Sequence, residues 1–141
     1  MKQFVQVGET FGDTVTLSTQ DIASFATALH DSNPLHHDPA FAKTTRFGQI
    51  IASGPHTAGI FMGLTASHLS KIGAVLGIGF DLKFAGPAFA NRPIAMRWRV
   101  TRTEWKEKLN GELVFVEGTA NHSDAEPVLA GTGTLLICET L

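Results

Sequence analysis

The chain has 141 residues and only one cysteine, Cys138. An internal disulfide is therefore impossible, and a reducing cytoplasm is the expected compartment. Cys138 stands at the end of the apolar run 134–138. We interpret it as a packed core thiol and not as a nucleophile.

Long hydrophobic runs are also missing. The uncharged segment from Thr57 to Ser70 contains four hydroxyl residues and two glycines, which leaves it short of the ~20 apolar residues of a membrane-spanning helix. The segment from Met1 to Glu9 has no apolar stretch like that of a signal peptide. The sequence therefore predicts a soluble protein without a membrane partner.

Neither sign of charge is in large excess, since 11 Lys and Arg oppose 13 Asp and Glu. Without a broad positive field, nucleic acid is not an expected partner. No repeat, low-complexity segment or linker divides the chain, so residues 1–141 are expected to form a single domain. A chain of this length can bury a sizeable core without disulfides or a structural metal.

Helix signals are confined to the first half of the chain. A capping-box-like pair, Ser18 and Asp21, predicts a helix ending near His30, and Asp38-Pro39 predicts a short helix through Lys43. Ser53-Gly54-Pro55 starts a third helix, which reaches Leu69. Small and apolar residues occupy nearly all sides of this third helix, so the helix is expected to be buried.

The second half alternates between apolar and polar residues, as strands do. Alternation over 76–84 and 94–101 predicts two strands, each with one buried face, and Asn110-Gly111 predicts a hairpin. Further strands are expected over 113–119 and 128–137, and an early one over 14–17. This order indicates an α+β fold, a largely antiparallel sheet on one central helix, and not a doubly wound parallel sheet.

Glycines at positions 73, 77 and 79 resemble a phosphate loop only superficially. The Lys-Ser/Thr that defines such a loop is missing, and the segment with these glycines lies at a predicted strand. A bulge or a close backbone approach is the expected reason for them.

Asp31, His36, His37 and Asp38 bring two carboxylates and two imidazoles into eight residues around a proline turn. Histidine with a neighbouring carboxylate is a usable acid–base pair. The alternatives are that Asp31 and Asp38 only cap backbone amides and that the histidines are solvated. A metal site is disfavoured, because zinc asks for three or four ligands and no His-x-x-x-His or Cys-x-x-Cys occurs.

Gly54 offers a second chemical feature. At the start of a buried helix its amide N–H has no partner inside the helix and lies at the positive end of the helix dipole, so it could bind an oxyanion. Alternatively, glycine here only permits a tight entry into the helix. His56 and His68, on the same helix, are interpreted as structural histidines.

The sequence resembles a known family over these residues. The run from Asp31 to Ala42 (DSNPLHHDPAFA), followed by Phe47 and by Ile50 to Gly54, is similar to the signature of the MaoC-like dehydratases, which include the (R)-specific enoyl-CoA hydratases. The resemblance implies a hot-dog fold and a homodimer, or a higher homo-oligomer, with sheets joined edge to edge. It also implies an acyl thioester of coenzyme A or acyl carrier protein as substrate, with no metal or other cofactor.

The same resemblance implies roles for single residues. Asp31 and His36 correspond to the catalytic pair, and the amide of Gly54 to the oxyanion donor. Water would add to the β-carbon of a trans-2-enoyl thioester, and the reverse reaction would dehydrate an (R)-3-hydroxyacyl thioester. Asn33 would brace the loop; together with Ser53 and Met62 it completes the expected substrate-binding set.

Several positions depart from the family pattern. Ser53 stands where many members carry histidine, Pro55 where a large apolar residue is common, and Met62 where some hydratases have a hydroxyl. Asn91-Arg92 replaces a frequent Gly-Asp pair. These departures reshape the pocket and leave the acyl group open, so that a small polar or branched acyl-CoA is also an expected substrate.

Two other functions stay open. One is a hot-dog thioesterase, in which the activated water attacks the carbonyl carbon. The other is a non-catalytic protein that binds acyl thioesters, which the departures at Ser53 and Met62 make plausible. The side chains considered for the phosphates of coenzyme A are those of Lys83, Arg97, Arg99 and Arg102, although exposed strand faces also carry arginine for solubility.

Overall fold

A computed structural model describes residues 3–141. Met1 and Lys2, the start of the segment without signal-peptide character, lie outside the described residues. The helices are α1 (Thr19–Ala28), α2 (Pro39–Thr44) and α3 (Gly54–Leu69), with 3₁₀ turns η1 (Pro34–His36) and η2 (Glu107–Leu109). Within residues 3–141, no helix has the length and apolar character needed to cross a membrane.

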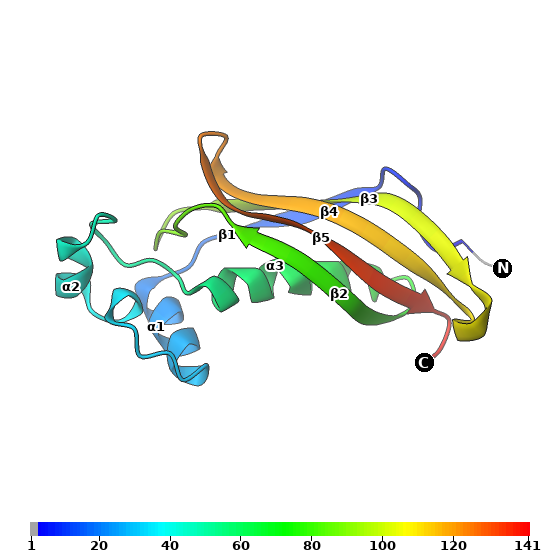
Figure 1. Cartoon of the computed structure of the whole chain (residues 1–141), viewed down its shortest axis with the longest axis horizontal. Helices are drawn as coiled ribbons and strands as arrows, with labels where there is room; N and C mark the ends of the chain where they lie inside the picture. Colours follow the sequence, from blue (N-terminus) through cyan, green and yellow to red (C-terminus); the bar gives the residue numbers. More distant parts are fainter. Residues whose placement is uncertain (1–2) are drawn as a thin grey trace.

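Within residues 3–141, five strands form one antiparallel sheet in the order β1-β3-β4-β5-β2. Their bounds are β1 Thr10–Val15, β2 Ala74–Phe84, β3 Ile94–Lys106, β4 Gly111–Ser123 and β5 Glu126–Cys138. The long helix α3 lies along one face of this sheet, and α1 and α2 sit together beside the start of α3 (Figure 1). The expected α+β hot-dog arrangement, a sheet around a central helix, is confirmed.

Two of the helix starts follow from local capping. The Ser18 hydroxyl accepts from the Asp21 amide and the Asp21 carboxylate accepts from the Ser18 amide, which closes a capping box at α1. These hydrogen bonds lower the pKa of Asp21. Asp38 accepts from the amides of Ala40 and Phe41 and so caps α2. Both predicted starts are confirmed.

Trp98 connects the sheet to the central helix. Its side chain is 1% exposed, stacks on Phe61 of α3 with ring centroids 4.0 Å apart, and donates from Nε1 to the Phe61 carbonyl at 2.9 Å. Ile94, Met96 and Val100 are buried on the same face of β3, as the alternation predicted. The position of α3, and with it the position of Gly54 at the start of α3, therefore depends on β3.

The position expected for the first strand was wrong. The strand is β1, Thr10–Val15, and not residues 14–17. It pairs with β3 from Thr10 opposite Arg99 to Val15 opposite Ile94. Gly12 permits this pairing, because a Cβ there would lie 2.0 Å from the backbone oxygen of Met96. Leu17 lies beyond the strand, buried, where its carbonyl accepts from the Asn91 amide.

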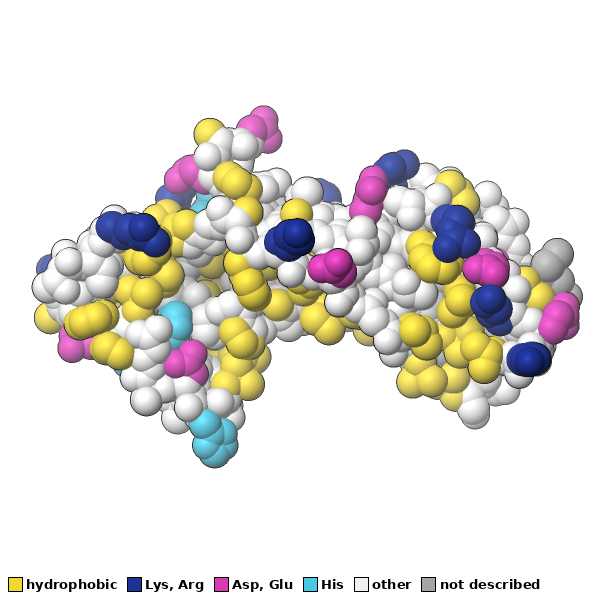
Figure 2. Space-filling model, viewed as in Figure 1, with side chains coloured by type: hydrophobic (Ala, Val, Ile, Leu, Met, Phe, Trp, Pro, Cys, Tyr) yellow, Lys and Arg dark blue, Asp and Glu magenta, His cyan; other side chains and the backbone are white. Residues whose placement is uncertain are grey.

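The expectation of one buried face on β2 was also wrong. Leu76, Ile78 and Phe84 are 50%, 57% and 60% exposed. In residues 3–141, β2 is an edge strand that pairs only with β5, and a register shift between Gly77 and Gly79 breaks its alternation. Gly77 and Gly79 thus mark a bulge, as predicted. The edge position leaves apolar side chains of β2 exposed. Figure 2 shows hydrophobic side chains in patches on one face of the molecule.

Cys138 is a core thiol, 3% exposed, with Sγ 3.7 Å from the Leu109 carbonyl oxygen at the far end of the sheet from α1 and α2 (Figure 1). Because nothing in this position contacts the candidate site, we expect Cys138→Ser to leave the turnover rate within about twofold of the wild type, and to lower Tm by a few degrees at most. Steady-state rates on purified, folded variant check this. A large loss of rate in the folded variant would refute the interpretation of the thiol as structural.

Candidate active site

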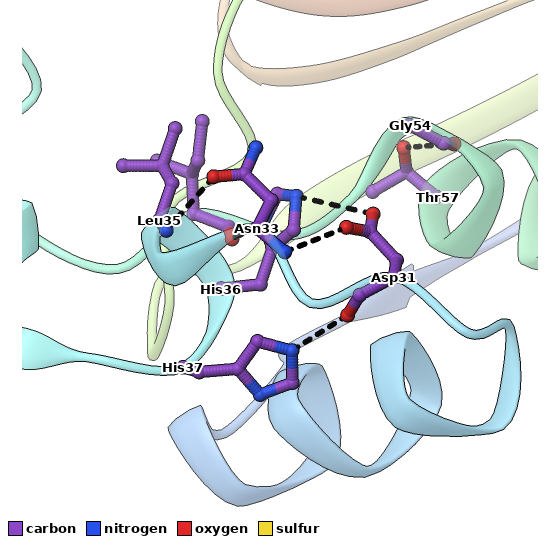
Figure 3. A network of polar contacts seen from close by, with 8 residues as sticks. Asp31, Asn33, Leu35, His36, His37, Gly54 and Thr57 are labelled. Carbon is purple, nitrogen blue, oxygen red and sulfur yellow. Dashed lines mark hydrogen bonds and ion pairs between the residues drawn. The ribbon is translucent and has the colours of Figure 1, made fainter.

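The loop after α1 is folded by its own polar groups (Figure 3). The Asp31 amide donates to the Ala26 carbonyl at the end of the helix. Asp31 Oδ1 then accepts from the Asn33 amide at 3.0 Å, and Asn33 Oδ1 accepts from the Leu35 amide at 3.1 Å, which caps η1. Asn33 therefore connects Asp31 to the start of η1, the turn that ends at His36, through these two hydrogen bonds.

His36 is buried, 6% exposed, and faces Asp31. Its Nδ1 lies 2.7 Å from the Ile51 carbonyl oxygen, while its Nε2 lies 3.6 Å from Asp31 Oδ2. A carbonyl oxygen only accepts, so Nδ1 carries the proton and donates it. In neutral His36 the lone pair is then on Nε2, which points toward the carboxylate (Figure 3).

With the proton of His36 on Nδ1, neither His36 Nε2 nor Asp31 Oδ2 carries a hydrogen to donate to the other, and at 3.6 Å a single small molecule between them can donate to both. Asp31 Oδ1 is already engaged by the Asn33 amide, so Oδ2 faces Nε2. A water molecule has two O–H donors and can give one to each acceptor. The separation of the pair thus matches the space that one bridging water molecule needs.

The other two members of the cluster have structural positions. His37 Nε2 lies 2.7 Å from the backbone carbonyl oxygen of Asp31, to which it donates, and Asp38 is the cap of α2. The alternative weighed for Asp38, a helix cap, is confirmed. Asp31 accepts from a backbone amide with one carboxylate oxygen, the alternative weighed for it, and faces His36 with the other.

Gly54 is the first residue of α3, so its amide has no partner inside the helix. Within residues 3–141 no carbonyl or side chain accepts from it. The Phe84 ring covers this glycine so closely that a Cβ would lie 2.9 Å from its Cζ. A cavity of about 280 Å³ adjoins Gly54 and is lined by Ile51, Thr57, Phe84 and Val128 among others. The unpaired amide thus lies beside an apolar cavity.

Two buried polar atoms in the first turn of α3 have no hydrogen-bond partner. They are Ser53 Oγ, on a residue that is 2% exposed, and His56 Nδ1, on a residue that is 5% exposed. The His56 ring stacks in parallel on Phe25 of α1, with centroids 4.2 Å apart. Burial lowers the pKa of His56; the nearby His36 lowers it further, and Asp21 opposes both.

The lowered pKa of His56 predicts a loss of stability in acid. Above its unfolded-state pKa of about 6.5 His56 is neutral in both states, and as pH falls below that value the unfolded chain takes up the proton first. His56→Phe keeps a ring against Phe25 but has no group to protonate. We expect its Tm to fall less between about pH 7 and pH 5 than the Tm of the wild type. Thermal unfolding against pH measures this difference, and parallel curves for the two proteins would contradict it.

His68 at the other end of α3 has partners of its own. Its Nε2 lies 2.6 Å from Glu9 Oε2, and its ring stacks on Phe11 with centroids 4.2 Å apart. These contacts tie α3 to the start of β1. The interpretation of His68 as a structural histidine is confirmed.

The structure does not bring Met62 to Asp31 and His36. Met62 is two turns beyond Gly54, about 12 Å along the helix axis, beside a groove with Gly77, Ile78, Phe80 and Leu82. The basic side chains considered for coenzyme A are strand residues, and two of them are already paired: Arg99 with Glu117 at 2.6 Å and Arg102 with Glu104 at 3.3 Å. Arg97 donates to the Met96 carbonyl.

A metal centre finds no support in the arrangement of ligands. Among residues 3–141 no group of three or more His, Cys, Asp or Glu side chains is placed to hold a metal ion. The sequence reasoning missed two contacts at the site: the Ile51 carbonyl, which fixes the His36 tautomer, and Phe84, which covers Gly54. A backbone acceptor leaves no sequence signal, and Phe84 falls at the end of a predicted strand, where nothing in the pattern indicates a contact with Gly54.

In this hot-dog protein a carboxylate faces a buried imidazole on the loop after α1, and that imidazole is bonded to the Ile51 carbonyl, three residues before the unpaired amide of Gly54. The family model described as MaoC like domain matches residues 4–123. The chain belongs to this family.

Two relatives and one solved structure are similar to this chain over most of its length. The chain is 34% identical over 99 residues to the (R)-specific enoyl-CoA hydratase of Aeromonas caviae, covering 70% of this chain and 73% of that protein. It is 28% identical over 131 residues to the mitochondrial 3-hydroxyacyl-[acyl-carrier-protein] dehydratase of Arabidopsis thaliana, covering 84% and 77%. The structure of the (R)-hydratase from A. caviae superimposes with a TM-score of 0.83 at 26% identity, covering 96% of this chain and 99% of that one.

Proposed function

We propose that this protein is a hydro-lyase that adds water to a trans-2-enoyl thioester and, in reverse, dehydrates an (R)-3-hydroxyacyl thioester. The observation that carries the proposal is the pair of facing acceptors, His36 Nε2 and Asp31 Oδ2, 3.6 Å apart. Family membership and the hydratase and dehydratase names of the relatives support it.

In the proposed mechanism, water donates one O–H to His36 Nε2 and the other to Asp31 Oδ2. As the water oxygen bonds to the β-carbon, the pair removes one proton, and the π electrons of the double bond move toward the thioester oxygen. The Gly54 amide stabilises the negative charge that develops on this oxygen. The pair then returns a proton to the α-carbon, so that one water molecule has been added and no electrons have been exchanged.

The chain's own groups supply the base, the acid and the oxyanion donor, so the mechanism we propose needs no metal or other cofactor. His36 is suited to the role because its Nδ1 donates to the Ile51 carbonyl, which holds the ring in the tautomer that leaves Nε2 basic. Asn33 acts through Asp31 by holding its Oδ1, and is a positioning residue.

The acyl group would lie on apolar surface next to Gly54. The cavity of about 280 Å³ lined by Ile51, Phe84 and Val128 is the proposed place for its first carbons. A second groove, of about 460 Å³, holds Met62 beside the bulge of β2. We place Met62 there as a contact for longer or branched acyl chains, carried by coenzyme A or by acyl carrier protein.

We propose that the active form is a homodimer joined through β2. The strand is an edge with unpaired backbone groups on one side, and its exposed Leu76, Ile78 and Phe84 would be covered by a second copy.

One hydrophobic core runs through the described chain, which supports a single domain. The single buried thiol fits a cytoplasmic protein.

The reverse reaction tests this proposal through stereochemistry. We expect (R)-3-hydroxybutyryl-CoA or (R)-3-hydroxyhexanoyl-CoA to produce the enoyl-thioester absorbance band, and the (S)-enantiomers to produce none. A free-thiol assay in the same samples should stay flat. Thiol release without the enoyl band would favour the thioesterase, and a band formed only from the (S)-enantiomer would contradict the proposed geometry.

A further inference from the structure

The hydroxyl of Ser53 stands in a capping position and makes no cap. Ser53 is the residue before α3, with φ −67° and ψ 150°, the geometry in which serine normally accepts from an amide two or three residues ahead. Here Pro55 has no amide hydrogen, and the His56 amide donates to the Ser53 carbonyl at 3.1 Å. Neither amide that normally bonds a capping serine is therefore bonded to Ser53 Oγ.

An unpartnered hydroxyl inside a protein is costly and rare. Ser53 is 2% exposed, and its Oγ is one of three such side-chain atoms in residues 3–141. A second is His56 Nδ1, in the same turn; the third, Trp105 Nε1, belongs to the far part of β3. An alanine would fill the place of Ser53 without this cost, and within residues 3–141 the hydroxyl is left available to a ligand.

The hydroxyl is adjacent in the chain to the one backbone donor assigned to the substrate. Gly54 follows Ser53 directly, and its amide has no acceptor in residues 3–141. A thioester oxygen that gains negative charge accepts two or more hydrogen bonds, and bonds to a charged acceptor are about twice as strong as neutral ones. Donors that are in place before the reaction need no rearrangement when the charge develops.

We propose that Ser53 Oγ donates the second hydrogen bond to the thioester oxygen, beside the Gly54 amide. This inference rests on the proposed hydratase function. Ser53 keeps its proton throughout, so it makes no covalent bond and changes none of the proton transfers of Asp31 and His36. The bond is formed with the ligand only, and this predicts opposite effects of one substitution on stability and on rate.

The test is Ser53→Ala, measured in two ways. Without substrate, we expect Tm to rise by about 2–4 °C, because an unsatisfied buried hydroxyl is removed. With an enoyl-CoA substrate, we expect kcat to fall about 100-fold, the order found when one oxyanion donor is removed, with KM changed much less. Ser53→Cys, of similar size and with a weaker donor, should give an intermediate kcat.

Ser70→Ala is the matched control, because Ser70 follows the same helix and its exposed hydroxyl donates to the Ser67 carbonyl at 3.3 Å. It should leave kcat unchanged. A fall in Tm for Ser53→Ala would mean that the hydroxyl has a structural partner, such as a buried water or a second copy, and would overturn the inference. An unchanged kcat would overturn it too. If the wild type itself neither hydrates nor dehydrates, the proposed function has failed, and this is seen before any variant is compared.

Discussion

Asp31→Asn lowers the rate of enoyl-thioester hydration by about 10²–10⁴-fold and leaves the fold intact, because it removes the acid–base partner of His36. The asparagine oxygen can still accept from the Asn33 amide, as Asp31 Oδ1 does at 3.0 Å. Its NH₂ group then faces His36 Nε2, where Oδ2 lies at 3.6 Å in the wild type. The amide donates to the base instead of accepting from the water.

His36→Ala should lose rate by a similar factor, and the double variant should lose little more, because the two residues act as one unit. Asp38→Asn is the matched control: Asp38 is seven residues away, and asparagine caps helices as well as aspartate does. We expect it to keep nearly the wild-type rate. Loss of the enoyl band at equal protein concentration, with circular dichroism as a fold check, gives the comparison; a near-normal rate for folded Asp31→Asn would refute the mechanism.

Trp98→Ala should lower the free energy of unfolding by about 3–5 kcal/mol, the range for deletion of a buried large aromatic side chain. The indole is 1% exposed, stacks on Phe61 and donates to its carbonyl. Deletion leaves a cavity between β3 and α3 and removes a link between the sheet and the helix that carries Gly54. Urea unfolding followed by circular dichroism measures the loss.

Two further variants separate the causes. Trp98→Phe keeps a ring against Phe61 and removes the hydrogen bond, so it should lose about 1–2 kcal/mol. Trp105→Ala, at a half-buried position of the same strand, should cost clearly less than Trp98→Ala, since less apolar surface is uncovered. An equal loss of unfolding free energy at positions 98 and 105 would show that the contact of Trp98 with α3 adds nothing to stability.

The helices were predictable because their starts depend on neighbours in the sequence. The capping box of Ser18 and Asp21 and the cap from Asp38 act over two or three residues, so the sequence contains all that is needed. The end of α1 lies two residues before the predicted end near His30: the helix stops at Ala28, and His30 adopts a positive φ of 63°. The Asn110-Gly111 turn was found, with Asn110 at φ 47°, although a 3₁₀ turn lengthens it.

The strands were harder to predict because burial of a strand depends on distant partners. The alternation of β3 was correct, since both of its neighbours and α3 enclose it. The same pattern in β2 misled, because its place at the sheet edge and the bulge at Gly77 and Gly79 are tertiary features. For β1 the pairing with β3 reaches Thr10, well before the residues whose pattern suggested a strand.

The candidate site, too, has features that the sequence predicts and features that depend on residues far away in the sequence. Asp31, Asn33 and His36 are close in sequence, so their meeting in one loop could be predicted. The tautomer of His36 could not, because it depends on a carbonyl fifteen residues away, that of Ile51. The missing cap of Ser53 needed the structure as well, since the sequence pattern alone predicts an ordinary helix start.

The most direct test of the proposed function follows crotonyl-CoA in one cuvette, with enoyl absorbance and free thiol recorded together for the wild type and for Asp31→Asn. A longer and a branched enoyl-CoA are run in the same way. We expect the wild type to remove the enoyl band of at least one of these substrates without thiol release, and Asp31→Asn to do so at least 100-fold more slowly. Thiol release in step with substrate loss, or equal rates for the two proteins, would contradict the proposed function.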